Sequence, residues 1–311
     1  MATGPEAVTC GEAMLLMLAE TGVPLDRAVD FRRSVTGAEP VVAAGLARLG
    51  HRTRWLGRLG ADAVGEAVLR ELRADGVDVS WTSFDPDAPT GLVLRDSRPE
   101  DVADAQYYGA GSAGSRLAAH DLPPEALAGT RLVHVSGITP MLSPLAAQAV
   151  HRLVMLARQS GAAFSFAPTV RGRLGTDHEW MRVVGPLMRE ADLVVASEDE
   201  LELLLGGGGE QAAKALLELG RAHLVVVTRP DGSAVAVGRE GRWVHEPVAG
   251  RTGPAGEAFT AGWLSAWLRN VEPERALAEA ACVAALAAEA PGDTTGLPTA
   301  AGRDRAVARL R

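Results

Sequence analysis

The chain has 311 residues, of which 47% are hydrophobic, and it carries a net charge of −8. This is enough apolar material for one large α/β domain, because single cores stop growing at roughly 250 to 300 residues. The acidic balance argues against a generic nucleic-acid binder, whose electrostatic footprint is normally basic. Cys10 and Cys282 lie far apart. They indicate neither a zinc site nor a disulfide framework, so a cytoplasmic protein is expected.

Two absences in the sequence narrow the function further. The start of the chain lacks the basic residues and apolar run of a signal peptide, and no uncharged 18-residue stretch predicts a membrane span. We therefore expect no membrane partner. The single lysine, Lys214, lies between two alanines. This excludes a Walker A loop and a protein-kinase strand lysine, so phosphate chemistry would depend on backbone amides, a metal and arginine.

Two regions near the start of the chain predict extended segments without partner helices. The first contains EAMLLMLAE (12–20), and the second contains TGLVLRDS (90–97) and DAQYYGAG (104–111). Strand-like runs that no helix follows do not fit a βαβ repeat and indicate a separate small β unit near one end of the sheet. We expect a β appendage, inserted from about 12–35 and 90–111, that serves as a lid, a dimer surface or both.

From about residue 130 onward, short apolar runs alternate with amphipathic ones. The predicted strands are 133–138, 163–168, 192–197 and 223–228, and helical patterns lie between them. Apolar strands separated by such helices indicate a mostly parallel sheet covered on both faces, which is the doubly wound α/β class. In that class ligands bind beyond the carboxyl ends of the strands. The run GGGG (206–209) is expected to be a helix C-cap and loop.

The stretch GRTGPAGEAFTAGWLSAWL (250–268) predicts a glycine-containing turn that leads directly into an apolar helix. Proline is favoured in a first helical turn, where its missing N–H costs nothing. The free amides of Ala255, Gly256 and Glu257 would then point out of the helix start and form an anion site. The carboxylate of Glu257 also has a simpler explanation, since an acid in the first turn complements the helix dipole.

This stretch belongs to a set of segments that matches one family in order along the chain. The others include GEAMLLML, TGAEPVVAAGLARLG, YYGAGSAGSRL and VHVSGITPMLSP. Together they resemble the PfkB (ribokinase-like) family of carbohydrate kinases, and within it 2-keto-3-deoxygluconate kinases, from about Val8 to Arg309. The resemblance implies one ribokinase-like domain over 1–311, a Rossmann-type sheet with a β lid, ATP with Mg²⁺, a sugar or sugar acid as substrate, and a homodimer formed through the lid.

The resemblance implies catalytic roles for the turn before the apolar helix. Relatives have Gly-Ala-Gly-Asp, in which amides stabilise charge on the transferred phosphoryl group and the Asp takes a proton from the sugar hydroxyl. Here the turn is Pro254-Ala255-Gly256-Glu257, so Glu257 is the implied base, with its carboxylate one methylene further out. A displacement of about 1 Å can cost roughly a hundredfold in rate. Arg251 stands where relatives have an Asp linked to a monovalent cation, and its guanidinium would either supply that charge or block the site.

The resemblance also implies a nucleotide side. Ser197 and Glu200 match an Asn-x-x-Glu run linked to Mg²⁺ and phosphate, which makes Glu200 the candidate metal ligand. Their spacing also fits a capping box, and the two roles are compatible. Thr228 and Gly232 match a phosphate loop, and Gly292 matches a loop that borders adenine in relatives or is an ordinary turn.

The implied substrate residues are Gly37, Tyr107 and Arg171. Around Gly37, Thr36 replaces a glycine and Val41 a sugar-binding asparagine of the relatives. Gly109 replaces an arginine for the acceptor's carboxylate. Ala167 and Thr169 likewise replace polar groups ahead of Arg171. Aromatic residues such as Tyr107 also pack lids or dimer faces.

Three functions follow from these matches and exchanges. The first is an ATP-dependent carbohydrate kinase with an altered substrate and Glu257 as its base. The second is a non-catalytic member of the family that binds nucleotide or sugar in a regulatory role. The third is a nucleoside kinase, which the exchanges permit without specifically supporting it.

Overall fold

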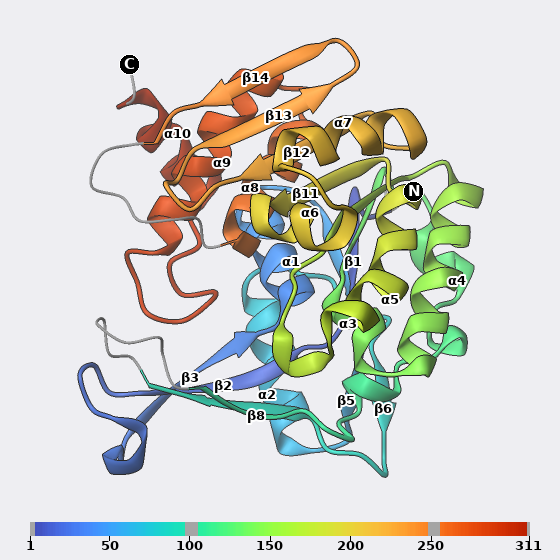
Figure 1. Ribbon diagram of the computed structural model, residues 1–311. Helices are drawn as coiled ribbons and strands as arrows, with labels where there is room; N and C mark the ends of the chain where they lie inside the picture. Colours follow the sequence, from blue (N-terminus) through green and yellow to red (C-terminus); the bar gives the residue numbers. More distant parts are fainter. Residues whose placement is uncertain (1–3, 97–104, 248–255, 310–311) are drawn as a thin grey trace.

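A computed structural model describes residues 4–96, 105–247 and 256–309 and shows a large sheet, a smaller sheet and a separate pair of strands (Figure 1). The larger sheet has eight strands in the order β14-β13-β12-β11-β10-β9-β1-β4. The strands from β12 to β4 are parallel, whereas β13 and β14 add to one edge in antiparallel fashion. The strand bounds are Ala7–Cys10 (β1), Thr53–Leu56 (β4), Leu132–Ser136 (β9), Ala163–Ala167 (β10), Leu193–Ser197 (β11), Leu224–Thr228 (β12), Ala234–Gly238 (β13) and Gly241–His245 (β14).

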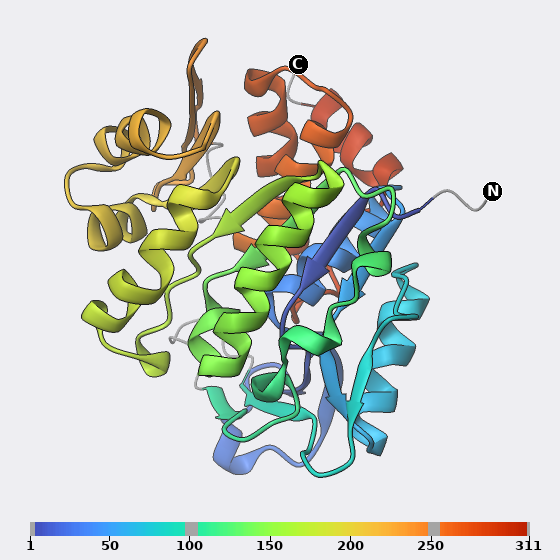
Figure 2. The same cartoon turned by 90° about the vertical axis from the view of Figure 1, so that its right-hand side faces the viewer.

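Helices cover both faces of this sheet because its strands are apolar on both sides. In β11, Val194 and Ala196 belong to a core shared with α4 to α7, whereas Leu193 and Val195 belong to a core shared with α1, α8 and α9. Figures 1 and 2 show these two helical layers on opposite sides of the strands. The helix bounds are Ala38–Arg48 (α1), Ala63–Ala74 (α2), Ile138–Leu142 (α3), Pro144–Ser160 (α4), Asp177–Glu190 (α5), Glu198–Leu205 (α6), Gly209–Leu219 (α7), Gly256–Leu268 (α8), Pro273–Ala287 (α9) and Ala300–Ala308 (α10).

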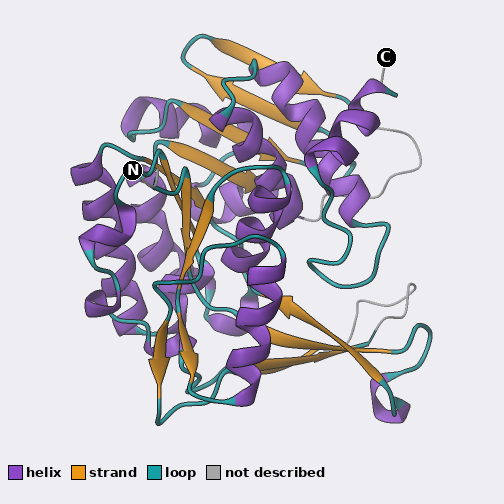
Figure 3. Ribbon diagram, turned by 180° about the vertical axis from the view of Figure 1, so that it is seen from behind, coloured by secondary structure: helices purple, strands orange, loops and turns teal. Residues whose placement is uncertain are grey.

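The smaller sheet has four strands in the order β3-β2-β7-β8 and projects from one end of the molecule (Figure 3). Its central strand β2 pairs in antiparallel fashion with β3 and in parallel with β7. The strands lie within the two segments predicted to form a β appendage. Their bounds are Met14–Ala19 (β2), Phe31–Thr36 (β3), Gly91–Arg95 (β7) and Ala105–Tyr108 (β8), and a separate two-stranded sheet joins Arg58–Gly60 (β5) to Ser83–Asp85 (β6).

The predicted doubly wound α/β class is confirmed, and so is the helix C-cap predicted in the run GGGG (206–209). Gly206 ends α6 with φ at 75°, a value that favours glycine, and its N–H donates to the Glu202 carbonyl at 2.9 Å. Gly208 caps the start of α7. The sequence analysis missed the antiparallel strands β13 and β14, which are five residues each. Among the described residues, no helix has the length and apolar character needed to cross a bilayer.

Candidate active site

Two neighbouring cavities lie at the carboxyl ends of the parallel strands. One, of about 330 Å³, is lined by residues that follow β10, β11 and β12, and we call it the nucleotide cavity. The other, of about 560 Å³, extends under the smaller sheet, and we call it the acceptor cavity. Parallel strands bring their carboxyl ends to one edge of a sheet, so segments far apart in sequence meet there. Ala38, Arg171 and Glu257 line both cavities.

Glu257 occupies the junction of the two cavities. It lies in the first turn of α8, and its side chain is 28% exposed. Its Oε1 is 3.5 Å from Nη2 of Arg171, which follows β10. Burial raises the pKa of Glu257 above its ordinary value of 4.5, whereas the charge of Arg171 lowers it and the charges of Asp293 and Glu200 raise it. A carboxylate with a raised pKa, open to two cavities, has the chemistry of a general base.

The start of α8 provides room for an anion beside this carboxylate. Gly256 is exposed at the first position of the helix and lines the nucleotide cavity. A Cβ built on Gly256 would meet no atom within 4 Å. Backbone N–H groups at a helix start carry partial positive charge and have no partner within the helix. Ala255, Pro254 and Arg251, to which the sequence analysis assigned roles, lie outside the described residues.

In the nucleotide cavity, Ser197 and Glu200 form the predicted capping box at the start of α6. The Glu200 N–H donates to Ser197 Oγ at 3.2 Å, and Glu200 Oε2 accepts from the Ser197 N–H at 2.9 Å. Glu200 Oε1 accepts a further bond, at 2.8 Å, from the N–H of Val170. Thr228 lies beside Ser197 in the register of β11 and β12. Both residues line the cavity together with Glu200.

The donor set of this cavity fits a magnesium ion. The described residues contain no cluster of three His, Cys, Asp or Glu side chains suited to a metal. Magnesium bound to substrate phosphates, however, needs only one or two protein carboxylates, since phosphates and water complete its coordination. The backbone bonds to both oxygens hold the Glu200 carboxylate in place, and each oxygen keeps a free lone pair.

Two predicted nucleotide residues do not line the nucleotide cavity. Gly232 forms the turn between β12 and β13, with φ at 87° and its N–H donating to the Arg229 carbonyl at 3.0 Å. Gly292 has φ at 96° and lines a separate hollow between β3 and the loop before α10. Both positions favour glycine for their backbone conformation alone. Arg229 does line the cavity, and its Nη2 pairs with Glu210 at 2.8 Å.

The three predicted substrate residues, Gly37, Tyr107 and Arg171, all line the acceptor cavity. Gly37 joins β3 to α1 with φ at 124°, and a Cβ there would lie 2.3 Å from the Glu12 carbonyl. Only glycine fits this position. Tyr107 lies on the edge strand β8 and is 41% exposed. Its ring packs against the guanidinium of Arg173.

Several residues of the acceptor cavity were not predicted as site residues. Asp293 accepts hydrogen bonds from Thr36 Oγ1 at 2.5 Å and from Arg95 Nη2 at 2.8 Å. Glu12 is 4% exposed, and its Oε1 accepts a hydrogen bond from Ser112. These contacts join residues more than 50 positions apart, and no local pattern in the sequence signals them.

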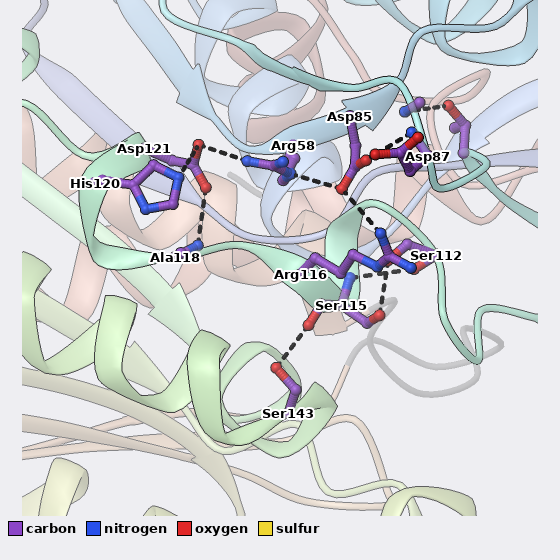
Figure 4. Close-up of polar contacts among 12 residues, drawn as sticks. Arg58, Asp85, Asp87, Ser112, Ser115, Arg116, Ala118, His120, Asp121 and Ser143 are labelled. Atoms are coloured by element: carbon purple, nitrogen blue, oxygen red, sulfur yellow. Dashed lines mark hydrogen bonds and ion pairs between the residues drawn. The ribbon is translucent and has the colours of Figure 1, made fainter.

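A polar network supports the loop that closes one side of the acceptor cavity (Figure 4). Ser115 Oγ donates to the Ser112 carbonyl at 2.7 Å, and Ser143 Oγ donates to the Ser115 carbonyl at 2.6 Å. Arg58 bridges Asp85 and Asp121 at 3.1 and 3.0 Å. Arg116 of the same loop pairs with Asp85 of β6 at 3.6 Å, and Ser143 caps the start of α4. These contacts tie the loop to both elements and so hold Ser112 beside Glu12.

The fold and this site define a class of protein. A doubly wound sheet presents a cavity with an exposed helix start and a candidate magnesium ligand, and a shared carboxylate faces a second cavity under a small sheet. That arrangement is suited to transfer between two bound molecules. The model of the pfkB family carbohydrate kinases matches residues 6–300, and the chain therefore belongs to this family.

Within this family, the chain is similar to 2-dehydro-3-deoxygluconokinases. The chain is 33% identical over 302 residues to a 2-dehydro-3-deoxygluconokinase of Bacillus subtilis, covering 94% of this chain and 93% of the relative. It is 31% identical over 301 residues to a 2-dehydro-3-deoxygluconokinase of Thermoproteus tenax, covering 94% and 91%. A solved PfkB protein from Polaromonas sp. JS666 superposes with a TM-score of 0.87 at 32% identity and covers 97% of this chain and 100% of that one.

A second solved structure supports the fold alone. The 2-dehydro-3-deoxygluconokinase of Thermotoga maritima has a TM-score of 0.90 at 22% identity and covers 98% of both chains. The ribokinase-like assignment predicted from the sequence is thereby confirmed. The assignment to the carbohydrate kinases, with 2-dehydro-3-deoxygluconokinases among the relatives, is confirmed as well. Neither the described site nor the comparisons favour the non-catalytic or the nucleoside-kinase alternative.

Proposed function

We propose that the protein transfers the γ-phosphoryl group of ATP to a hydroxyl group of a sugar acid related to 2-dehydro-3-deoxygluconate. The position of Glu257, shared by the two cavities, is the observation that supports this most directly. The 2-dehydro-3-deoxygluconokinase of Bacillus subtilis, 33% identical over nearly the whole chain, supports the choice of acceptor.

In the proposed reaction the acceptor's hydroxyl oxygen forms a bond to the γ-phosphorus as the bond from that phosphorus to the ADP oxygen breaks. Glu257 accepts the hydroxyl proton, and the raised pKa of its carboxylate makes it a better base than an ordinary glutamate. Arg171, 3.5 Å away, orients that carboxylate. The Gly256 N–H at the helix start stabilises negative charge on the transferred group.

Mg²⁺, when bound, neutralises charge on the phosphates, and Glu200 is the residue that would hold it. Thr228 and Ser197 line the nucleotide cavity and would contact the nucleotide. We further propose that residues 1–311 form one ribokinase-like domain, that the smaller sheet is a lid over the acceptor, and that two copies associate through it. Tyr108 on its edge strand supports the last point, because its side chain is 55% exposed and lies outside the acceptor cavity.

The test is a phosphorylation assay on the purified full chain with ATP and Mg²⁺. The acceptors are 2-dehydro-3-deoxygluconate, fructose and adenosine, and mass spectrometry detects the product. We expect the sugar acid to gain one phosphoryl group and adenosine to gain none. Phosphorylation of adenosine alone would contradict the proposal and support the nucleoside-kinase alternative. Tight binding of ATP without transfer to any acceptor would support the non-catalytic one.

A further inference from the structure

The acceptor cavity is lined by three arginines, and two of them are neutralised by a carboxylate in its own wall. Arg95 pairs with Asp293 at 2.8 Å, and Arg171 pairs with Glu257 at 3.5 Å. An arginine whose charge is already matched within the protein gains little from a second anion. Neither residue is therefore an obvious anchor for a charged group on the acceptor.

Arg173 is the third arginine, and its surroundings differ. It lies in the single 3-10 turn Gly172–Leu174 (η5), is exposed, and lines the acceptor cavity. Its Cζ lies 3.5 Å from the centroid of the Tyr107 ring, so the guanidinium packs on the ring face. In the part of the chain that the structure describes, no carboxylate forms an ion pair with Arg173. Stacking uses the face of the guanidinium and leaves the N–H donors along its edge free.

Arg173 lowers the pKa of Glu12, another residue of the acceptor cavity, but Glu12 does not neutralise the charge of Arg173. Its carboxyl is almost fully buried, and Ser112 donates to its Oε1. Burial raises the pKa of Glu12 from 4.5 to about 7, against smaller lowering effects of Ser112 and Arg173. A carboxyl group with this pKa is only partly ionised at neutral pH, so the cavity keeps a positive charge at Arg173.

We propose that Arg173, held against Tyr107, binds the carboxylate of the acceptor through the free edge of its guanidinium and so selects an acidic sugar over a neutral one. The planar edge of a guanidinium matches a carboxylate with two parallel hydrogen bonds. This inference rests on the proposed function, because it names a residue that selects the acceptor for the same site. Tyr107 is a positioning residue, since it acts on the acceptor through Arg173.

A substitution at Gly109 can test whether a guanidinium in the cavity is sufficient for binding, whichever residue supplies it. It lines the same cavity, and a Cβ built there would lie 3.8 Å from Glu12 Oε2 and from Met14 Sδ, which is ordinary contact. Gly109 is absent from the glycines with positive φ, so a side chain is tolerated by its backbone. An arginine at 109 would therefore bring a second guanidinium into the cavity from another element.

The experiment measures binding by calorimetry without ATP, so that it does not depend on turnover. The ligands are 2-dehydro-3-deoxygluconate and fructose, and the proteins are the wild-type full chain and its variants. Loss of a charge-assisted bidentate bond predicts that Arg173→Gln raises the Kd for the sugar acid roughly 10- to 100-fold. The Kd for fructose should stay within about twofold. Arg70→Gln, which removes an exposed arginine of α2 outside both cavities, is the matched control and should change neither.

Three further variants separate recognition from damage to the fold. Tyr107→Phe keeps the ring and should bind the sugar acid like the wild type, whereas Tyr107→Leu should weaken it. Adding Gly109→Arg to Arg173→Gln should restore at least part of the lost affinity. Wild-type affinity for the sugar acid in Arg173→Gln, or an equal loss for fructose, would overturn the inference. Arg173-dependent binding without phosphorylation would overturn only the proposed function, and phosphorylation insensitive to Arg173 would overturn only this inference.

Discussion

Burial of Glu12 in the acceptor cavity predicts a pH-dependent cost to stability. Burial is the main cause of its raised pKa, and the charge of Glu39 adds to it, whereas Ser112 and Arg173 act in the opposite direction. The folded protein therefore holds this proton up to about pH 7, and the unfolded chain releases it near 4.5. Between these values the folded state binds more protons than the unfolded state, so the free energy of unfolding falls as pH rises.

The size of the effect follows from the two pKa values. One pKa unit corresponds to about 1.4 kcal/mol, so the difference between 4.5 and about 7 gives a cost on the order of 3 kcal/mol above pH 7. Glu12→Gln keeps the size of the side chain, can still bond to Ser112, and cannot ionise. We expect the variant to gain about 1–3 kcal/mol in free energy of unfolding relative to wild type between pH 5 and pH 8.

The assay is equilibrium unfolding in urea at pH 5 and pH 8, with two spectroscopic probes to check two-state behaviour. Glu218→Gln removes an exposed carboxylate of α7 and serves as the control, for which no comparable change with pH is expected. A difference between Glu12→Gln and wild type that is the same at both pH values would refute the reasoning.

Three other results follow from particular residues. Thr169 has φ at 49°, a conformation that is unfavourable for a β-branched side chain. Thr169→Asn should therefore raise the free energy of unfolding by roughly 1 kcal/mol in urea titrations. A loss of stability would argue against backbone strain at this residue. Gly37→Ala places a Cβ 2.3 Å from the Glu12 carbonyl at a residue whose φ is 124°. The substitution should lower the free energy of unfolding by about 1–3 kcal/mol in the same assay. An unchanged free energy would show that the junction of β3 and α1 adapts. Because Glu257 must be ionised to accept a proton and its pKa is raised, kcat/KM should fall as pH decreases through a value above 4.5, and a flat profile down to pH 4.5 would be inconsistent with its role as the base.

The sequence was sufficient for the fold because the fold depends on repeated local signals. Runs such as DLVVAS bury alternate residues on both faces of the sheet, and caps such as Ser197 with Glu200 mark where a helix begins. The signal was weakest at the sheet edge. The strands β13 and β14 are short and antiparallel, and no helical pattern separates them.

The site was predicted in part, and the limit has a physical cause. Arg171, Glu200 and Glu257 stand in short motifs, and the structure brings them to the same strand ends. Glu12, Arg173 and Asp293 depend on contacts between distant elements, such as the stacking of Arg173 on Tyr107 across 66 positions of sequence. An arginine is free to bind a ligand only if no carboxylate of the protein pairs with it. The neighbouring residues in the sequence do not show whether such a pair forms.

The central claim is that Glu257 acts as the catalytic base. Relatives have an Asp at this position, so the carboxylate of Glu257 lies one methylene further from the helix. Its place between the cavities argues that it still reaches both molecules. The most direct measurement is kcat for phosphorylation of 2-dehydro-3-deoxygluconate by wild type and Glu257→Gln, with the Kd for ATP determined by calorimetry in parallel. We predict a loss of about 100- to 10,000-fold in kcat with an unchanged Kd, as for removal of a general base. A Glu257→Gln variant that turns over at the wild-type rate would contradict the account.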